Sequence, residues 1–510
     1  MRLLTSDQAR FLDHASIEQF GISSIDLMKN AGKRIASKAK AMLNEYTNPT
    51  ILIVCGKGNN GGDGYAAASI LHNEGLSVMI HSITTEKDIT NESLAFFREC
   101  INLGIPNSFG TDLNDLNRSD LIIDGLLGIG LKGAVRDNII PLLNWINDSN
   151  TKILSIDVPS GLNSDTGTCD PIAVKADATL TFGAPKVGMH LRLGPEYCGD
   201  IIVEDIGFPS LDVVDFPGSE WRFIDENIVQ DHFHKPKNDI SKHSAGKVLV
   251  IAGSRGMTGA AILSTYGALR SGAGLTITTS PGSLNEIYER SIIEGMTLSL
   301  DDDDTGIVGY EHYDLIMDKV GWADSVLLGP GLGRDISTQR LIKKLLVSVD
   351  KPLVLDADGL FPFSANIEYL SKREHPLVIT PHFGELARLM GEQKELIISE
   401  FPTLMNMLME KFDQVCLVKQ VPSCIVQGKN IRINTTGNPG LATAGTGDVL
   451  AGMITSLISQ GVNCYDSALI GAYVHGKVSD HLISHKGFRG QIASDLLEHM
   501  PRVIKSYERS

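Results

Sequence analysis

Two aspartates in the N-terminal half stand where chemistry is often done in α/β proteins. Asp124 follows the apolar run 121–123, and Asp157 follows 153–156. Because the carboxyl ends of parallel strands share one edge, where open α/β sheets bind ligands, we expect the two side chains to converge. One strand-end Asp is usually only a helix cap, but a glycine-rich third cluster at the same edge favours a site. Asp157 is our candidate acid–base group.

That third cluster is the run GKGNNGGDG at 56–64, between an apolar strand and an expected helix from about Tyr65 to Asn73. Glycines let backbone amides approach an anion at a helix N-terminus. A tight turn that serves only packing would show the same sequence pattern. The next strand, 76–83, offers no acidic residue for a ribose, which disfavours an NAD-dependent dehydrogenase. Asn60, Asp124 and Ser160 form an all-oxygen set that suits a hard cation.

The strongest local signal of the C-terminal half is NPGLATAGTGD at 438–448, followed by an apolar helix. Gly445–Gly447 would present consecutive amides at a helix N-terminus, where a transferring phosphoryl group can be stabilised. Asp448 lies in the first turn, where the helix dipole favours its ionised form, so it can accept a proton from a hydroxyl. A plain helix cap is the alternative. The sequence contains no GxxxxGK[ST] motif, which argues against a P-loop protein.

Further strand-end pieces accompany Asp448: GPGLG at 329–333, DADG at 356–359 and TPHFGE at 380–385. His382 alone would more often be structural. Lys419 ends a strand, where a lysine can meet phosphates.

Continuous apolar runs alternate with amphipathic stretches along the chain, which is typical of parallel strands buried on both faces. We therefore predict an α/β fold with parallel sheets. A break around Phe208–Trp221 predicts two domains, 1–217 and 225–510. Cys424–Gln427 and Ile431–Asn434 read as a hairpin forming an antiparallel edge. Thr5-Ser6-Asp7-Gln8 fits a capping box that opens an amphipathic helix.

Composition excludes several classes of function. The 510 residues are 42% hydrophobic, which excludes a disordered chain, and the formal net charge of −16 disfavours nucleic-acid and membrane-surface partners. No secretory signal or membrane span is legible. The seven cysteines are scattered without a CxxC pair, which argues against a disulfide framework and a zinc site. We expect a cytoplasmic protein.

GKGNNGGDG, DGLLGIGLKGAV, DVPSGLNSDTG and TFGAPK together resemble the YjeF N-terminal family, the NAD(P)H-hydrate epimerases, over about residues 1–210. The resemblance implies a Rossmann-like three-layer α/β/α domain that binds the hydrated dinucleotide as substrate, with Asp157 at the damaged ring. It implies K⁺ held by Asn60, Asp124 and Ser160. The implied substrate contacts are Asn59, Asn60, Gly61, Gly62, Asp63, Gly128, Ile129, Gly130, Leu131, Lys132, Gly133, Ala134 and Asp157. The chain departs from the family at Lys29, usually Glu, and at Ile129, usually Thr.

GTGD before a helix resembles the ribokinase-like fold, and the fuller set of GPGLG, PLVLDADGL, TPHFGE, NPGLATAGTGDVLAGMI and YVHG resembles the NAD(P)H-hydrate dehydratases over about 235–505. The resemblance implies a mostly parallel sheet. Implied hydrate contacts are Ala260, Gly333, His382 and Asp448. Implied nucleotide contacts are Lys419, Gln420, Val421, Pro422, Ser423 and Gly447. Gln420 replaces the usual Gly, Ser423 the usual Thr, and Ala444 a Gly.

These resemblances imply a fused nicotinamide-nucleotide repair protein. One half would epimerise R and S hydrates of NADH and NADPH. The other would dehydrate the S form with Mg²⁺ and ADP, which ends as AMP and phosphate, or with ATP as the donor. We expect small-molecule partners, no nucleic acid or membrane, and a homo-oligomer. The alternative is a ribokinase-like small-molecule kinase with a non-catalytic N-terminal binding module, or a scaffold protein.

Overall fold

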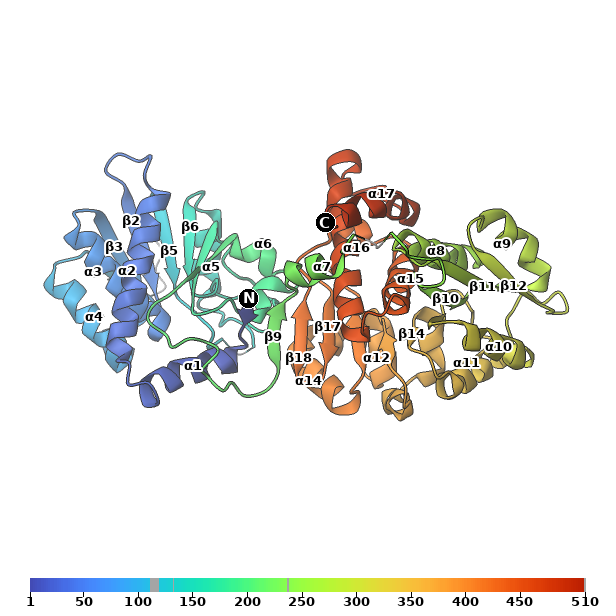
Figure 1. Ribbon diagram of the computed structural model, residues 1–510. Coiled ribbons are helices and arrows are strands. Elements are labelled where there is room, and N and C mark those ends of the chain that lie inside the picture. The colour runs from blue at the N-terminus through green and yellow to red at the C-terminus, as the bar shows by residue number, and fades with distance from the viewer. Residues whose placement is uncertain (111–118, 132, 236–237, 509–510) are drawn as a thin grey trace. The chain divides into compact units, whose positions relative to one another are not determined.

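The computed structural model describes residues 1–110, 119–131, 133–235 and 238–508. The chain divides into two compact units, Arg2–Gly218 and Ser219–Ser510, with Met1 assigned to the second. Each unit has its own sheet and its own helices (Figure 1). Strand β9 (Glu220–Phe223) falls between the predicted limits 1–217 and 225–510, and it belongs to the sheet of the second unit.

The first unit is built on a seven-stranded sheet in the order β4-β3-β2-β5-β6-β7-β8, and its strand pairs are all parallel. The strands are β2 (Thr50–Cys55), β3 (Ser77–Ser82), β4 (Asn107–Phe109), β5 (Leu121–Gly125), β6 (Lys152–Ile156), β7 (Ala178–Phe182) and β8 (Asp200–Glu204); β1 (Arg2–Leu3) precedes them. The helices are α1 (Ser6–Glu18), α2 (Ser24–Met42), α3 (Asn59–Asn73), α4 (Asn91–Asn102), α5 (Ile140–Asp148) and α6 (Gly194–Cys198), with 3₁₀ turns η1 (Glu86–Asp88) and η2 (Val187–His190).

Both faces of this sheet are covered, which explains why its strands are apolar throughout. In β2, Ile51 and Ile53 pack in the core formed with α2, α3 and α4. The alternate residues Leu52 and Val54 pack in the core formed with α5. The predicted α/β class is thus confirmed, because successive side chains of a strand point to opposite faces.

Two local features of the first unit concern the site. The predicted capping box is present: the Gln8 amide donates to Thr5 Oγ1 at 3.3 Å, and the Thr5 amide to Gln8 Oε1 at 3.2 Å. It starts α1 at Ser6. Helix α3 begins at Asn59, earlier than the expected Tyr65, so the second half of the glycine-rich run is already helical.

The sheet of the second unit runs β9-β18-β17-β16-β15-β14-β13-β10-β11-β12. Its remaining strands are β10 (Lys247–Ile251), β11 (Leu275–Pro281), β12 (Met296–Leu300), β13 (Ser325–Leu328), β14 (Leu353–Leu355), β15 (Leu377–Ile379), β16 (Val415–Val418), β17 (Cys424–Gln427) and β18 (Asn430–Ile433). Pairing is parallel except around β17, which is antiparallel to β16 and β18. The hairpin was expected to form the edge of the sheet. This was wrong, because β9 pairs with β18 and covers it.

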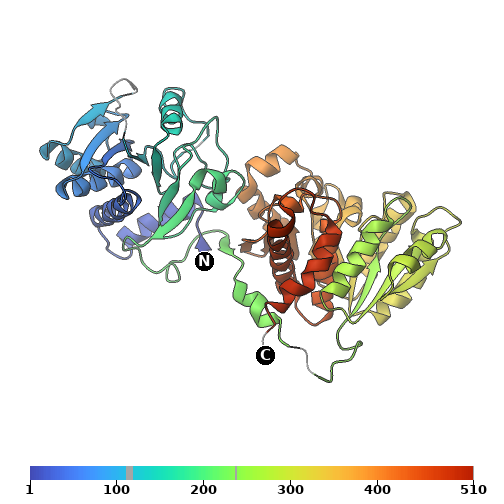
Figure 2. The same ribbon diagram turned by 90° about the horizontal axis from the view of Figure 1, so that it is seen from above.

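Helices α8, α15, α16 and α17 pack on one face of this sheet and form a hydrophobic core with β-strand residues such as Val250, Leu327 and Val354. Figure 2 shows the red helices α15–α17 beside the yellow-green α8. The helices are α7 (Glu226–His232), α8 (Thr258–Arg270), α9 (Asn285–Ser291), α10 (Tyr313–Trp322), α11 (Ile336–Ser348), α12 (Phe383–Met390), α13 (Lys394–Ser399), α14 (Phe401–Lys411), α15 (Thr446–Ser459), α16 (Cys464–Lys486) and α17 (Ala493–Lys505). The 3₁₀ turns are η3 (Gly282–Leu284), η4 (Tyr310–His312), η5 (Ala357–Phe363), η6 (Ile367–Lys372) and η7 (Pro439–Leu441).

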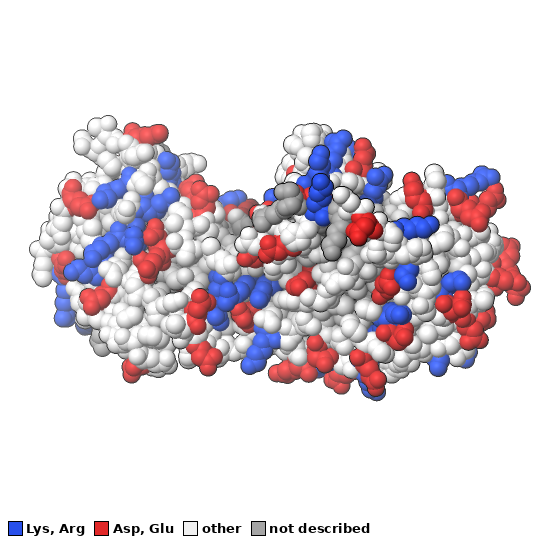
Figure 3. All heavy atoms as spheres, viewed as in Figure 1, with Lys and Arg blue, Asp and Glu red and all other residues white. Residues whose placement is uncertain are grey.

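The surface carries charges of both signs. On the face shown in Figure 3, Lys and Arg side chains are interspersed with Asp and Glu. Among the described residues, no helix is both long and apolar enough to cross a membrane.

Candidate functional site

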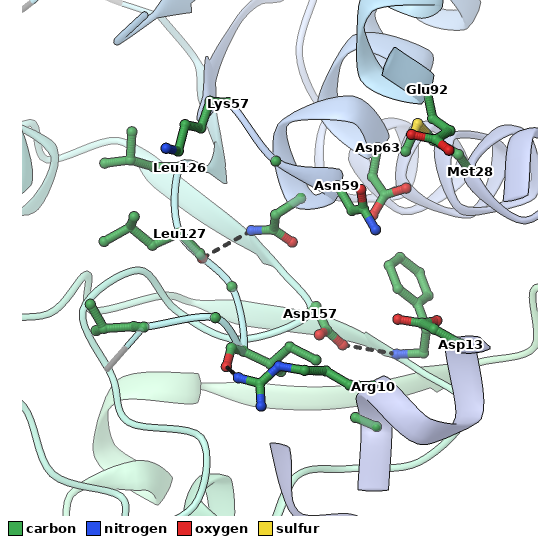
Figure 4. Close-up of a pocket in the computed structure, with 18 of the residues that line it drawn as sticks. Arg10, Asp13, Met28, Lys57, Asn59, Asp63, Glu92, Leu126, Leu127 and Asp157 are labelled. Carbon is green, nitrogen blue, oxygen red and sulfur yellow. Dashed lines mark hydrogen bonds between the residues drawn. The ribbon is translucent and has the colours of Figure 1, made fainter. Parts of the chain in front are cut away.

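The first unit contains a cavity of about 1120 Å³ at the carboxyl edge of its sheet (Figure 4). Helices α1 and α2 form one wall, and the loops after β2, β5 and β6 form the others. A cavity of this size exceeds what a drug-sized ligand needs and leaves room for a larger one.

Most of the predicted epimerase residues line this cavity. They are Asn59, Asn60, Asp63, Gly128, Ile129, Gly130, Leu131, Ala134 and Asp157. Gly61 and Gly62 are not part of the lining: a Cβ on Gly61 would lie 2.0 Å from the Gly56 carbonyl oxygen, and one on Gly62 would lie 2.4 Å from Ser93 Oγ. They are glycines because the turn packs tightly. Gly133 is also outside the lining, and Lys132 lies outside the described residues.

Asp157 is held rigidly. Its φ is 63°, in the left-handed region that favours glycine. Lys186 Nζ donates to Asp157 Oδ1, and Thr181 Oγ1 donates to the same oxygen at 3.0 Å. The Lys186 side chain is only 3% exposed, and that of Asp157 is 15% exposed. The hydrogen bonds of the described residues to this carboxylate all fall on Oδ1, so Oδ2 is left for a ligand.

Sequence reasoning gave no role to two residues beside Asp157, namely Lys186 and Asp13. Burial and, next, the Asp157 carboxylate raise the pKa of Asp13 to about 6, while Lys186 opposes the rise. Burial, followed by repulsion from Asp157 and Asp13, raises the pKa of Asp63 well above its usual range. Lys186 stands at the end of the TFGAPK motif, but only the fold shows its partner. Asp13 reads as an ordinary polar position of an amphipathic helix.

The predicted cation ligands lie together behind the cavity wall. Asp124 is completely buried, and Ser160 donates to it from Oγ at 2.5 Å and from its amide at 2.9 Å. Ser160 Oγ also lies 3.2 Å from the Leu127 carbonyl, to which Asn60 Nδ2 donates at 3.0 Å. Burial raises the pKa of Asp124, and hydrogen bonds from Ser160 and Ser155 oppose the rise. Asn60 and Ser160 therefore meet at the Leu127 carbonyl oxygen, and Asp124 is joined to them through Ser160.

In the second unit, Asp448 lies in the first turn of α15, directly after the left-handed Gly445 (φ 88°) and Thr446–Gly447. The turn favours glycine because a side chain at this φ is strained, and a Cβ on Gly445 would also lie 2.5 Å from the Leu263 side chain. His475 Nε2 lies 3.0 Å from the Thr446 carbonyl oxygen and anchors the same turn. Burial and, next, Asp356 raise the pKa of Asp448 to about 7, and Lys419 opposes this.

Lys419 connects the parts of this second site. Its Nζ donates to Asp356 Oδ1 at 2.5 Å, and Thr380 Oγ1 donates to the same oxygen at 2.7 Å. Burial lowers the pKa of Lys419, but the carboxylates of Asp356 and Glu385 outweigh it and leave that pKa raised. A Cβ on Gly447 would lie 3.4 Å from Lys419 Nζ, so the lysine reaches the turn that carries Asp448.

The other predicted dehydratase residues lie at neighbouring strand ends. His382 caps α12 by accepting from the amides of Gly384 and Glu385 at 2.9 and 3.2 Å, and its side chain is still 56% exposed. Gly333 donates its amide to Asp358 Oδ2 at 3.0 Å.

Ala260 and the predicted nucleotide-binding turn complete the set. Ala260 lies on the first turn of α8, beside Gly331, whose Cβ would approach it to 2.8 Å. Gln420, Val421, Pro422 and Ser423 form the turn between β16 and β17, which Ser423 Oγ closes by donating to the Gln420 carbonyl at 2.8 Å. Among the described residues, no three His, Cys, Asp or Glu side chains are placed to hold a metal ion.

Each α/β unit carries a lysine–aspartate ion pair, largely shielded from solvent, at the strand ends where such sheets bind ligands, as expected of an enzyme with two sites. Residues 24–188 match the family of the YjeF-related protein N-terminus, and residues 248–502 match the NAD(P)H-hydrate dehydratase family. The bifunctional NAD(P)H-hydrate repair enzyme Nnr of Moorella thermoacetica is 34% identical over 100% of this chain and 97% of its own. Its namesake from Dictyoglomus turgidum is 33% identical over 99% and 98%. The chain belongs to the family of bifunctional NAD(P)H-hydrate repair enzymes.

A solved structure agrees with the fold of the second unit. The crystal structure of a ribokinase-like superfamily protein from Enterococcus faecalis is 26% identical, with a TM-score of 0.50. The match covers 58% of this chain and 99% of that one. The predicted ribokinase-like fold is therefore confirmed.

Proposed function

We propose that this chain restores hydrated NADH and NADPH in two steps. The N-terminal domain, 1–217, interconverts the R and S epimers, and the C-terminal domain, 225–510, dehydrates the S epimer with ADP or ATP. One observation carries the proposal: each unit holds a largely buried lysine–aspartate ion pair at the strand ends of its sheet, Lys186 with Asp157 and Lys419 with Asp356. Family membership over the full length supports both activities in one chain.

In the epimerase, Asp157 contacts the damaged ring, and its fixed carboxylate accepts a proton there. The start of α3, 59–63, and the loop 128–134 bind the rest of the dinucleotide through those of their residues that line the cavity. Asn60, Asp124 and Ser160 would hold K⁺, and the oxygen donors around the Leu127 carbonyl fit that ion. When bound, K⁺ supplies positive charge that offsets the buried Asp124 carboxylate.

The dehydratase must remove a hydroxyl, and hydroxide is a poor leaving group. In the proposed reaction Asp448 takes the proton of the ring hydroxyl, whose oxygen attacks the terminal phosphorus of the nucleotide as the bridging P–O bond breaks. The lone pair of the ring nitrogen then forms a C=N bond as the C–O bond to phosphate breaks, and loss of a ring proton restores the double bond. ADP thus becomes AMP and phosphate, and no oxidant or reductant is consumed.

The remaining predicted residues divide between the two ligands. Ala260, Gly333, His382 and Asp448 contact the hydrate, while Lys419–Ser423 and Gly447 contact the nucleotide. A positive Lys419 suits the phosphates, and the amides of the turn 445–447 suit the transferred phosphoryl group. Mg²⁺ would arrive with the nucleotide, and the carboxylates of Asp356 and Asp358 are oxygen ligands of the kind it prefers.

Mixed-epimer NADH hydrate with Mg²⁺ and either ADP or ATP tests the proposal, with NADH followed by its near-ultraviolet absorbance. Conversion of nearly all the hydrate is expected, and the productive nucleotide identifies the donor. Conversion that stops once the S epimer is used would refute the epimerase. A stable phosphorylated product without NADH would support a small-molecule kinase instead. Asp448→Asn is the control, since it should leave the hydrate intact.

The setting of the protein is a proposal as well. We infer a cytoplasmic enzyme with small-molecule substrates, no nucleic-acid or membrane partner, and a homo-oligomeric assembly. The seven cysteines are all free, which suits a reducing compartment.

A further inference from the structure

Asp13 lines the same cavity as Asp63 and Asp157 but comes from α1, a different wall (Figure 4). The chain just before α1 is fixed beside Lys186: the Leu4 amide donates to the Pro185 carbonyl at 3.0 Å, and the Val187 amide donates to the Leu4 carbonyl at 3.0 Å. The helix therefore cannot shift independently of the loop that carries Lys186.

A second contact ties α1 to the glycine loop after β5. Arg10, one turn before Asp13, donates from Nη2 to the Ile129 carbonyl at 2.9 Å. The position of the Asp13 carboxyl in the cavity is thus set by two independent attachments of its helix.

We propose that Asp13 is a second proton-transfer group of the epimerase, which works with Asp157 on the hydroxyl-bearing carbon of the damaged ring. This inference rests on the proposed function. Inversion at one carbon needs a group lost from one side and a group added from the other, so one fixed carboxylate is insufficient. Asp157 Oδ1 is occupied by Lys186 and Thr181, whereas no hydrogen bond or ion pair of the described residues engages the Asp13 carboxyl.

The charges around Asp13 suit a proton donor. The groups that face it are Asp63 from α3, Asp157 after β6 and Lys186 after β7, while Arg10 of its own helix is turned to Asp7 and the Ile129 carbonyl. Burial and Asp157 raise the pKa of Asp13 to about 6. A carboxyl with such a pKa is partly protonated at neutral pH, which general acid catalysis needs.

The proposed step balances without any further reagent. Asp13 donates its proton to the departing hydroxyl as the C–O bond breaks, and the adjacent ring nitrogen forms a C=N bond with its lone pair. Water leaves. A second water adds to the other face, the electron pair returns to nitrogen, and Asp157 accepts the proton. Asp13 is then ionised and Asp157 protonated, which is the starting state for the reverse conversion.

The test is Asp13→Asn in the full chain, with the exposed Glu18→Gln at the end of the same helix as matched control. We expect kcat for R-epimer conversion to fall by about 100-fold or more with KM changed by less than about 2-fold. Dehydration of S epimer in the same sample should not change. Wild-type R conversion should fall as pH rises through about 6, and the variant should lose this dependence.

Each outcome separates the two claims. A wild-type protein that never converts the R epimer refutes the proposed function. A wild-type protein that does, with Asp13→Asn as active as Glu18→Gln, overturns the role of Asp13. Asp13→Glu should restore part of the activity. If the activities of the variants instead follow their thermal stabilities alone, the role of Asp13 is also overturned. In H₂¹⁸O, each epimerisation should place one solvent oxygen in the hydroxyl, and epimerisation without ¹⁸O uptake would contradict the proposed step.

Discussion

Lys419 donates to one oxygen of Asp356 at 2.5 Å, while the other oxygen of that buried carboxylate has no hydrogen-bond partner among the described residues. Asp356 is 1% exposed, so the lysine neutralises a charge that water cannot reach. The same Nζ lies next to Gly447 and faces Asp448. Lys419 therefore serves both the stability of the second unit and the electrostatics of its reaction.

Lys419→Met should consequently damage both properties. We expect loss of ADP-dependent dehydration and a free energy of unfolding reduced by about 3–5 kcal/mol, because an unpaired carboxylate remains buried. Denaturant unfolding and NADH formation measure the two effects. The exposed Lys394→Met is the matched control. A variant of wild-type stability would show that Asp356 finds another partner.

Asp448 should make dehydration sensitive to acid. Its pKa of about 7 means that the carboxylate is protonated as pH falls through 7, so the rate of S-epimer dehydration should fall there. Because the folded-state pKa lies above the unfolded value, the stabilising contribution is complete below pH 4 and lost as pH rises through 7. Asp448→Asn should therefore abolish turnover yet raise the Tm at about pH 8 and leave it nearly unchanged at about pH 4. An unchanged Tm at the higher pH would contradict the burial of an ionised Asp448.

Lys186→Met should alter the pH dependence of the epimerase. Without this cation, Asp13, Asp63 and Asp157 repel one another unopposed, so the pKa of Asp13 should rise further. We expect a lower kcat for R-epimer conversion and a pH midpoint displaced upward from that of wild type. Lys175→Met, which removes an exposed lysine paired with Glu196, is the control and should keep the wild-type midpoint. A downward displacement would exclude Lys186 as the compensating charge.

Potassium should stabilise the first unit if Asn60, Asp124 and Ser160 bind it. At equal ionic strength, we expect a higher Tm in KCl than in tetramethylammonium chloride, since an ion that binds only the folded state stabilises it. Ser160→Ala should remove the difference, and the exposed Ser210→Ala should retain it. Equal Tm values in both salts for the wild-type protein would refute the site.

The sequence predicted the strands best where burial is complete. The run at 248–252 predicted β10 (Lys247–Ile251) well, because all side chains of the run are buried and a short, continuous run of β-branched and apolar residues suits such a strand. The prediction that β18 forms the edge of the sheet was wrong because the sequence pattern does not reveal β9. Strand β9 is short, with the sequence Glu-Trp-Arg-Phe, and it lies in a stretch that indicates a break between domains. Burial of Trp221 alone reveals it as a strand.

The site was predictable only as far as its motifs extend. Asp157 and Asp448 follow strand-end or helix-start patterns, so their neighbourhoods could be foreseen. Asp13 has no such pattern, since its role depends on α1 packing beside Lys186, a relationship between segments more than 170 residues apart in sequence. Gly61 and Gly62 show the opposite case: glycines in a binding motif serve the tight packing of the backbone turn and do not line the cavity.

The left-handed backbone of Asp157 has a consequence for how this protein can fail. At φ 63°, glycine has a lower conformational energy than aspartate. A change of Asp157 to glycine therefore relieves backbone strain, but it also removes the carboxylate that pairs with Lys186. Replacing the partner at the same time, as in Asp157→Gly with Lys186→Met, would give a chain that folds well and performs no epimerisation. A chain with both substitutions would pass any screen that selects for solubility or abundance. Only a measurement of R-epimer conversion would reveal the loss.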